Sequence, residues 1–440
     1  MTEVTHRRMW RIAGPIVLSN ATIPLLGAVD TGVVGQLGSA APIGAVGLGA
    51  VILATLYWVF GFLRMGTSGL AAQAQGAGDG AERTAVLLRA VMLGLTAGLV
   101  LIVAQVALFA LAFSLAPASP EVETLTQRYL AIRIWGAPAT IALYAVTGWL
   151  VGVERTRQVF LLQLWVNGLN IVLDLWFVLR LGWGVPGVAA ATLIAEWTGL
   201  GLGAWFCRDA FGRALAEARA RLGNRPALLK MVAVNRDIMI RSVALQLCFT
   251  AFVFLGARFG DVTLAANQVL LQFLAILSHA LDGFAFAAET LVGQAIGARA
   301  VAEARRAVRL ALQWTFWGGL LLGLVFWLAG PLLIDLMAAD PEVRAEARHY
   351  LPWIVVAPVI GAFAWAYDGV YIGALLTSEM RRLMLVAALA YAGSLILMIP
   401  FANHGLWAAL MLLFAVRSIL MHWQSPKVAA RACVPPAAGE

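Results

Sequence analysis

The sequence predicts an all-α membrane protein with twelve transmembrane helices in two pseudo-symmetric six-helix bundles. Three observations predict this fold class. Of the 440 residues, 62% are hydrophobic and only 12% are charged, with a mean hydropathy of +0.85, which exceeds the apolar share of soluble domains. Twelve stretches stay apolar for roughly 20 residues, the length that crosses a bilayer as a helix. The second half of the chain also repeats motifs of the first.

Short polar connections separate the twelve apolar stretches. The first stretch continues for more than 25 residues without a cleavage site, so we interpret it as a spanning helix and not as a signal peptide. The predicted helices cover residues 10–35, 44–72, 86–116, 129–152, 158–180, 184–206, 238–257, 262–290, 309–337, 350–374, 383–401 and 404–423.

The longest polar connection predicts the domain division. Residues 207–237 contain many arginines and lie between the sixth and seventh helices. We therefore expect an N-terminal lobe over 1–206, a cytoplasmic linker over 207–237, and a C-terminal lobe with a short tail over 238–440.

The basic residues predict the orientation. Of the 31 lysines and arginines, 22 fall in connections on one side of the predicted membrane. Because basic residues are retained in the cytoplasm, both termini are predicted to be cytoplasmic in a multi-pass protein of the bacterial inner membrane. This orientation explains the net charge of +8, so we expect membrane lipids as partners and no nucleic acid. We also expect the protein to be a monomer.

Two pairs of similar segments indicate an internal repeat. YLAIRIWGAPATIALYAVTGWLVG (129–152) aligns with YLPWIVVAPVIGAFAWAYDGVYIG (350–373), and GLAAQAQGAG (69–78) aligns with AETLVGQAIG (288–297). Six helices separate the members of each pair, so the repeat is parallel, with its axis along the membrane normal. Two such bundles around a central cleft are typical of transporters.

Carboxylates within the apolar stretches are the candidate functional residues. Asp30 lies in PLLGAVDTGVVGQLG, and Asp174 follows Asn170 by one helical turn in NGLNIVLDLWF. A charged carboxylate at membrane depth is costly, so it needs a partner, a proton or a function. Counting 1.5 Å per residue from the cytoplasmic ends places Asp30 and Asp174 at similar depth, which favours a shared site over two structural carboxylates.

Further polar residues occupy other predicted helices. The sixth helix contains Thr192 and Glu196, and the second half contributes Gln246, Asp282, Glu289 and Asp368. Asp282 and Glu289 lie toward the cytoplasmic ends of their predicted helices. A structural ion pair with basic residues there is as good an explanation for them as a functional role. Arg417 lies deep in the last helix and requires an acidic partner, for which Asp368 and Asp282 are the candidates.

Signatures of catalysis and of cofactors are missing from the sequence. It contains no GxxxxGK[ST] motif, so ATP is not the predicted energy source. Three scattered cysteines and five isolated histidines have no metal-ligand spacing. The sequence therefore predicts no enzyme, no catalytic residues and no cofactor, and an ion gradient as the source of energy.

Several motifs, in order along the chain, carry a family resemblance. They are PLLGAVDTGVVGQLG, FLRMGTSGLAAQAQGA, NIVLDLWFVL, GVAAATLIAEW, NRDIMIRSVALQLCF, HALDGFAFAAETLVGQAIGAR and YDGVYIGA. Together they resemble the multidrug and toxic compound extrusion (MATE) transporters, and specifically their DNA-damage-inducible F (DinF) branch.

This resemblance implies a V-shaped pair of lobes that alternates between two open states. Such transporters export organic cations or other amphipathic small molecules in exchange for H⁺ or Na⁺. The coupling site that the resemblance implies consists of Asp30, Asn170, Asp174 and Thr192. Asp368 resembles a carboxylate of the sodium-coupled branch, but SVALQLCFTAF (242–252) lacks the acidic residue of that branch. We therefore expect H⁺ to be the coupling ion.

Two alternatives remain open. One is a Na⁺-coupled multidrug antiporter with Na⁺ at Asp30, Asn170 and Asp174. The other is a flippase for a lipid or a lipid-linked precursor, for which a more cationic cleft is expected. Candidates for secondary coupling or substrate contact are Asp368, Glu196, Asp282 and Gln246.

Overall fold

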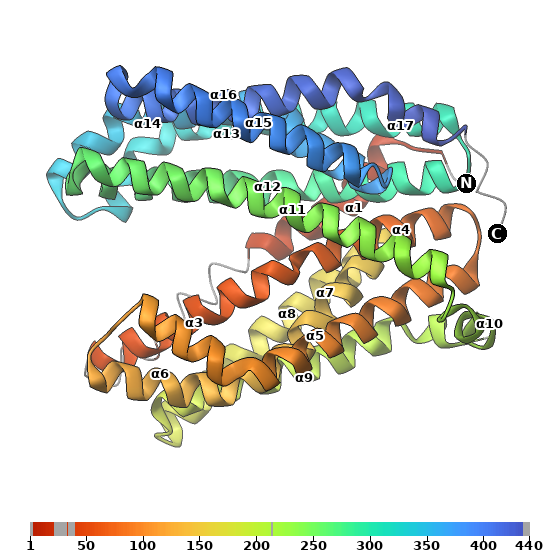
Figure 1. Cartoon of the computed structure of the whole chain (residues 1–440), viewed down its shortest axis with the longest axis horizontal. Helices are drawn as coiled ribbons and strands as arrows, with labels where there is room; N and C mark the ends of the chain where they lie inside the picture. Colours follow the sequence, from red (N-terminus) through yellow and green to blue (C-terminus); the bar gives the residue numbers. More distant parts are fainter. Residues whose placement is uncertain (1–2, 22–32, 34–39, 213, 434–440) are drawn as a thin grey trace. The chain divides into compact units, whose positions relative to one another are not determined.

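The computed structural model describes residues 3–21, 33, 40–212 and 214–433. Every regular element in these ranges is a helix, and no strand occurs among them (Figure 1). This confirms the predicted all-α class.

The helices of the first half overlap the predicted stretches, and one further short helix lies in the predicted linker 207–237. A short 3₁₀ segment links α3 to α4 (Val59–Gly61), and another links α6 to α7 (Ile134–Gly136). The helices are α1 (His6–Ala21), α3 (Ala40–Trp58), α4 (Phe62–Gly76), α5 (Gly80–Leu115), α6 (Pro120–Arg133), α7 (Ala137–Gly152), α8 (Thr156–Asp174), α9 (Gly184–Phe206) and α10 (Ala214–Arg221).

The second half consists mainly of long helices. They are α11 (Arg225–Gly256), α12 (Asp261–Gly297), α13 (Val301–Met337), α14 (Pro341–Gly373), α15 (Thr377–Met398), α16 (Ala402–Gln424) and the short α17 (Pro426–Arg431).

Eleven helical segments of the described residues are long and apolar enough to cross a membrane. They correspond to all the predicted spans except 10–35, whose part beyond Ala21 lies mostly outside the described residues. Several helices begin earlier than predicted; α13 starts at Val301 and not at 309. The extra turns are polar, because a helix continues beyond the hydrocarbon layer while the apolar pattern marks only the part inside it.

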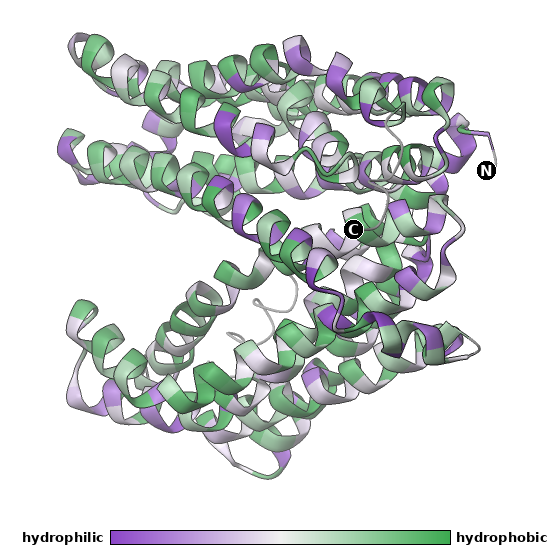
Figure 2. Ribbon diagram, turned by 45° about the vertical axis from the view of Figure 1, so that its right-hand side comes forward, coloured by the Kyte–Doolittle hydropathy of each residue, from purple (hydrophilic) through white to green (hydrophobic). Residues whose placement is uncertain are grey.

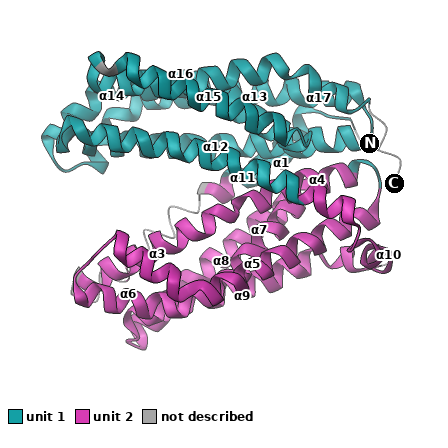
Figure 3. Cartoon of the chain, viewed as in Figure 1, with its two compact units in different colours: residues 1–17, 76–78, 232–440 teal, residues 18–75, 79–231 magenta. Residues whose placement is uncertain are grey.

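Contacts divide the chain into two compact units (Figure 3). Unit 1 contains residues 1–17, 76–78 and 232–440, and unit 2 contains residues 18–75 and 79–231. Residues 1–17 therefore group with the C-terminal helices, although the predicted N-terminal lobe included them. The predicted linker 207–237 is largely helical, since it contains α10 and the first turns of α11.

Close helix packing holds unit 2 together. α5 packs on α7, and α8 packs on α9. Glycine permits the first contact: a Cβ on Gly98 would lie 2.3 Å from the Cα of Pro138. Small residues that allow backbones to approach are typical of helix contacts in membranes, where packing replaces the hydrophobic effect as the driving force.

Unit 1 has a core of its own among α11, α12, α14 and α16. Phe252 packs edge-to-face on Trp407 at 4.7 Å between ring centroids, and both side chains are fully buried. A reciprocal amide pair, Asn267 with Asn403, is buried beside them, and Trp407 Nε1 donates to Asn267 Oδ1. The amide and indole groups are thereby satisfied inside an apolar environment.

Apolar residues predominate along the helices of both units, and hydrophilic residues gather toward many helix ends (Figure 2). Large apolar side chains are exposed on the helix surfaces, with Val103 at 86%, Val106 at 79% and Leu115 at 77% exposure on α5 alone. A water-soluble protein rarely exposes such a continuous apolar face, whereas a lipid-facing helix requires one.

Candidate functional site

The polar residues of α8 meet α9 inside unit 2. Asn170 and Asp174 lie one helical turn apart on α8 and are both fully buried. Asn170 Nδ2 donates a hydrogen bond of 2.9 Å to Thr192 Oγ1 on α9. Thr192 in turn donates to the backbone oxygen of Val188 at 3.0 Å. The structure therefore brings together three of the four residues named as the coupling site.

The backbone changes its winding directly after Asp174. The α-helical part of α8 ends at this residue, and Leu175–Arg180 continues as a π-helix. π-helical turns are rare and are found frequently at functional sites. The carboxylate of Asp174 thus lies at the junction between two helical geometries, which the sequence pattern did not indicate.

Asp30, the fourth predicted residue, lies outside the described residues. Its meeting with Asp174 at a shared depth stays a prediction.

One turn after Thr192, α9 contributes Glu196 to a buried ion pair with Arg133 of α6. Glu196 accepts two hydrogen bonds from Arg133, with an Nη1–Oε2 distance of 2.7 Å and an Nη2–Oε1 distance of 3.0 Å. Tyr57 donates to the backbone oxygen of Arg133. Gly136 leaves room for the pair, since a Cβ there would lie 2.1 Å from Glu196 Oε2.

This ion pair was not predicted from the sequence, because Arg133 lies near the outer end of the predicted helix 129–152 and nothing marked it as buried. The helical span begins earlier than predicted, at Pro120, and continues to Gly152, so Arg133 lies well inside it and is buried in the unit. A charge-assisted, bidentate contact satisfies the carboxylate fully, so Glu196 is held by a fixed counter-charge.

Unit 1 contains a second buried group of charges, on α11, α14 and α16. Arg417 Nη2 contacts both carboxylate oxygens of Asp368, at 3.0 and 2.8 Å. Arg241 Nη2 donates to Oδ2 of the same carboxylate. The partner required for Arg417 is therefore Asp368, one of the two candidates. The contact with Arg241 was not predicted, although an arginine inside a predicted helix was a signal for it.

The other candidates of unit 1 lie on separate helices. Gln246 is exposed on α11, and Asp282 is half-buried on α12, where it interacts electrostatically with Arg241. Glu289 is buried two turns further along α12. Among the described residues, no three His, Cys, Asp or Glu side chains come close enough to hold a metal ion.

Two groups just beyond the end of α9 have shifted pKa values, one because of an ion pair and one because of burial. The Arg155 guanidinium hydrogen-bonds Asp209 and lowers the pKa of that carboxyl below its usual range. Burial raises the pKa of the neighbouring Cys207 thiol to about 12. These groups lie beyond the end of α9 and not within the spanning segments.

Known proteins are similar to this chain in sequence and in fold. The MatE family model matches residues 15–176 and 238–402. The chain is 38% identical over 428 residues to "DNA damage-inducible protein F" of Escherichia coli, covering 96% of this chain and 93% of that protein. It is 30% identical over 329 residues to "Probable multidrug resistance protein NorM" of Deinococcus radiodurans, covering 70% and 67% of the two chains.

Solved structures of similar fold support the same relationship. "Crystal structure of MATE in the bent conformation" superposes with a TM-score of 0.88 at 20% identity, covering 97% of each chain. The resemblance drawn from the sequence motifs is thus confirmed. Since the family model matches most of the chain and the similarity to DNA damage-inducible protein F extends over nearly its full length, this chain belongs to the MatE family, whose members are transporters and not enzymes.

Proposed function

We propose that this transporter is a secondary active efflux antiporter that exports organic cations and amphipathic compounds in exchange for H⁺. The observation that carries the proposal is the burial of Asp174 one turn from the hydrogen-bonded pair Asn170–Thr192, at the junction with a π-helix. A buried carboxylate in an otherwise apolar helix is a functional residue by default. The similarity to proteins named for multidrug resistance supports the substrate class.

The proposed coupling is competition for one negative charge. When Asp174 and Asp30 are ionised, they attract a cationic substrate. A proton that binds to either carboxylate removes this charge and releases the substrate, since a neutral carboxyl no longer attracts a cation. Asn170 and Thr192 position the site: their hydrogen bond fixes the α8–α9 contact beside Asp174.

The charges of unit 1 favour H⁺ over Na⁺. Asp368, the carboxylate that resembles one of the sodium-coupled branch, already accepts hydrogen bonds from two guanidinium groups. A sodium ion there would have to displace an arginine or lie beside two positive charges. We therefore assign Asp368, and likewise Glu196 with Arg133, a fixed structural charge. Asp282 and Gln246 remain candidates for substrate contact.

We also propose a location and an oligomeric state. The excess of basic residues on one side supports cytoplasmic termini, because positive charge is retained in the cytoplasm. The similarity to a protein of Escherichia coli supports a bacterial inner membrane. The proposed functional unit is a monomer, because both groups of buried charges are complete within one chain.

Reconstitution into liposomes tests the function. Efflux of a fluorescent cationic dye is measured under an imposed proton gradient and, separately, under an imposed sodium gradient. We expect the proton gradient alone to drive transport, and Asp174→Asn and Asp30→Asn each to lower the driven rate at least tenfold.

Asp209→Asn is the matched control, because it removes a carboxylate of unit 2 that is half exposed and lies outside the spans. It should transport like the wild type. Normal proton-driven efflux by Asp174→Asn would contradict the site, and sodium-driven efflux would move the assignment to Na⁺ at Asp30, Asn170 and Asp174. Dye retention under both gradients, with movement of a labelled lipid between leaflets, would instead establish the flippase alternative.

A further inference from the structure

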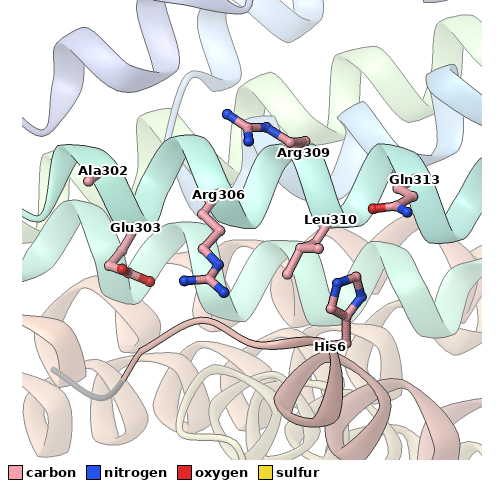
Figure 4. Close-up of a pocket in the computed structure, with 7 residues that line it drawn as sticks. All are labelled: His6, Ala302, Glu303, Arg306, Arg309, Leu310 and Gln313. Carbon is pink, nitrogen blue, oxygen red and sulfur yellow. The ribbon is translucent and has the colours of Figure 1, made fainter.

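A cavity of 560 Å³ opens in unit 1 between the start of α13 and the N-terminal segment, here called the His6 pocket (Figure 4). Glu303, Arg306, Arg309, Leu310 and Gln313 line it from α13, and His6 faces them from the first residue of α1. Figure 4 shows His6 projecting toward the helix between Leu310 and Gln313, with Arg306 pointing to the N-terminal segment.

The N-terminal segment is fixed to α13 by specific contacts. The backbone N–H of Val4 donates to Glu303 Oε2 at 2.7 Å, and the Val4 side chain is fully buried. Glu3 forms an ion pair with Arg306. The pocket therefore has a second wall that is held in place, and the carboxylate of Glu303 is occupied by a backbone donor.

The groups that face the opening are mainly hydrogen-bond donors. Trp314 Nε1 donates to His6 Nδ1 at 3.0 Å, so a neutral His6 carries its proton on Nε2, where it is a donor. Arg309 and Gln313 are exposed one turn apart. Arg306 is paired with Glu3, and the Glu303 carboxylate accepts from Val4 N–H, so Arg309 is the exposed cation of the lining that is left to meet an anion.

The position of the His6 pocket along α13 indicates which kind of anion it would bind. The charged turns with Arg305, Arg306 and Arg309 end at Gln313, and the helix continues with Trp314 and then with exposed Trp317 and Leu321. Trp10 of α1 packs edge-to-face on Trp314, with 5.1 Å between ring centroids. Aromatic rings between a basic turn and an exposed apolar surface mark the boundary between headgroups and hydrocarbon.

We propose that the His6 pocket binds the phosphate headgroup of an anionic phospholipid. The phosphate oxygens accept from His6 Nε2 and Gln313, and from Arg309 once its exposed side chain, which points away from His6 in Figure 4, turns toward them. The acyl chains lie along the exposed apolar face of α1 and α13 beyond the tryptophans. Free phosphate shares the headgroup chemistry, but it would make no use of the adjacent apolar surface. Basic pockets beside spanning helices are a recurrent type of lipid site.

Native mass spectrometry of the purified full chain tests this proposal. The protein is equilibrated with mixed micelles that contain equal amounts of phosphatidylglycerol and phosphatidylcholine, and the retained lipids are counted. We expect the wild type to prefer phosphatidylglycerol, and Arg309→Gln to reduce this preference about fivefold, the usual effect of one basic residue at an anionic headgroup. Arg309 has an exposed side chain, so the variant should fold.

Arg305→Gln is the matched control, because it removes the same charge from an exposed neighbour on α13 that does not line the pocket. It should keep the preference. Equal retention of both lipids by the wild type, or an equal loss in the control, would overturn the proposal. A second arm adds inorganic phosphate without lipid: if phosphate alone raises the melting temperature as much as the lipid does, the ligand is free phosphate and the lipid assignment is wrong. The experiment uses no ion gradient, so its outcome is independent of the proposed antiport.

Discussion

Arg133 and Glu196 form a buried bidentate ion pair that joins α6 to α9 one helical turn from Thr192. This position links a structural charge pair to the proposed coupling site, because Thr192 and Glu196 lie on the same face of α9. Any change that tilts α9 to release Glu196 also moves the oxygen that accepts from Asn170. The pair therefore holds the α8–α9 contact in register.

Removal of one partner of this ion pair should lower the free energy of unfolding much more than replacement of both partners. Glu196→Gln leaves the buried guanidinium of Arg133 without a counter-charge, which typically costs about 3–5 kcal/mol. The double variant Arg133→Met/Glu196→Leu replaces the pair by apolar side chains and should recover most of this loss. Unfolding in detergent, followed by intrinsic fluorescence, measures both variants. A double variant that is less stable than Glu196→Gln would show that the pair has another role.

The contact between α5 and α7 gives a second prediction. Gly98→Ala would place a methyl group 2.3 Å from backbone atoms of Pro138, so the two helices must move apart. Overpacking of this kind destabilises by about 1–3 kcal/mol. Thermal unfolding of the purified variant measures the effect.

Gly201→Ala is its control, since an added Cβ there meets nothing within 4 Å on the exposed face of α9. Alanine favours the helix over glycine by up to about 1 kcal/mol, so this variant should be at least as stable as the wild type. Equal loss in both variants would mean that helix contacts through Gly98 do not limit stability.

A third prediction concerns acid. The pKa of Asp209 is lowered in the folded protein by its hydrogen bond with Arg155. Because the folded value lies below the unfolded one, near 3.9, the carboxylate adds stability above about pH 4 and loses it as the pH falls through the folded value. Asp209 is half exposed, so the contribution should be only about 0.2–1 kcal/mol.

The comparison of wild type with Asp209→Asn isolates this effect. Their melting temperatures should differ at pH 7, and the difference should shrink as the pH falls below 4 toward 3, because the lowered pKa of Asp209 is approached from above. Glu121→Gln, which removes an exposed carboxylate at the start of α6, should give no difference at either pH. A difference between wild type and Asp209→Asn that is as large at pH 3 as at pH 7 would contradict the ion pair as its cause.

The sequence was sufficient for the helices and for part of the polar contacts. Asn170 and Asp174 could be placed on one helix face by their spacing, and a buried Arg417 required a carboxylate such as Asp368. The partners of Arg133 and Arg241 could not be found, because 63 and 127 residues separate the members of each pair. Local hydropathy does not specify which distant helices are in contact. It also does not distinguish the polar first turns of α6 from a loop.

The cysteines provide a test of orientation. Burial raises the pKa of the Cys207 thiol to about 12, so almost none of it is the reactive thiolate at pH 8, and Cys248 is buried within α11. Cys433 is exposed after α17. A maleimide should therefore label the native protein once, and Cys433→Ser should abolish the labelling until the protein is denatured.

The same reaction in intact cells reports the side of the membrane. If the C-terminal end is cytoplasmic, as the distribution of basic residues predicts, a membrane-impermeant maleimide should fail to label Cys433 until the cells are permeabilised. The Cys433→Ser variant with a cysteine in place of exposed Glu342, at the start of α14, is the opposite control, because this helix end is predicted to face outward. It should react in intact cells. Labelling of Cys433 before permeabilisation would invert the orientation, and with it the direction in which the proton gradient drives the proposed exchange.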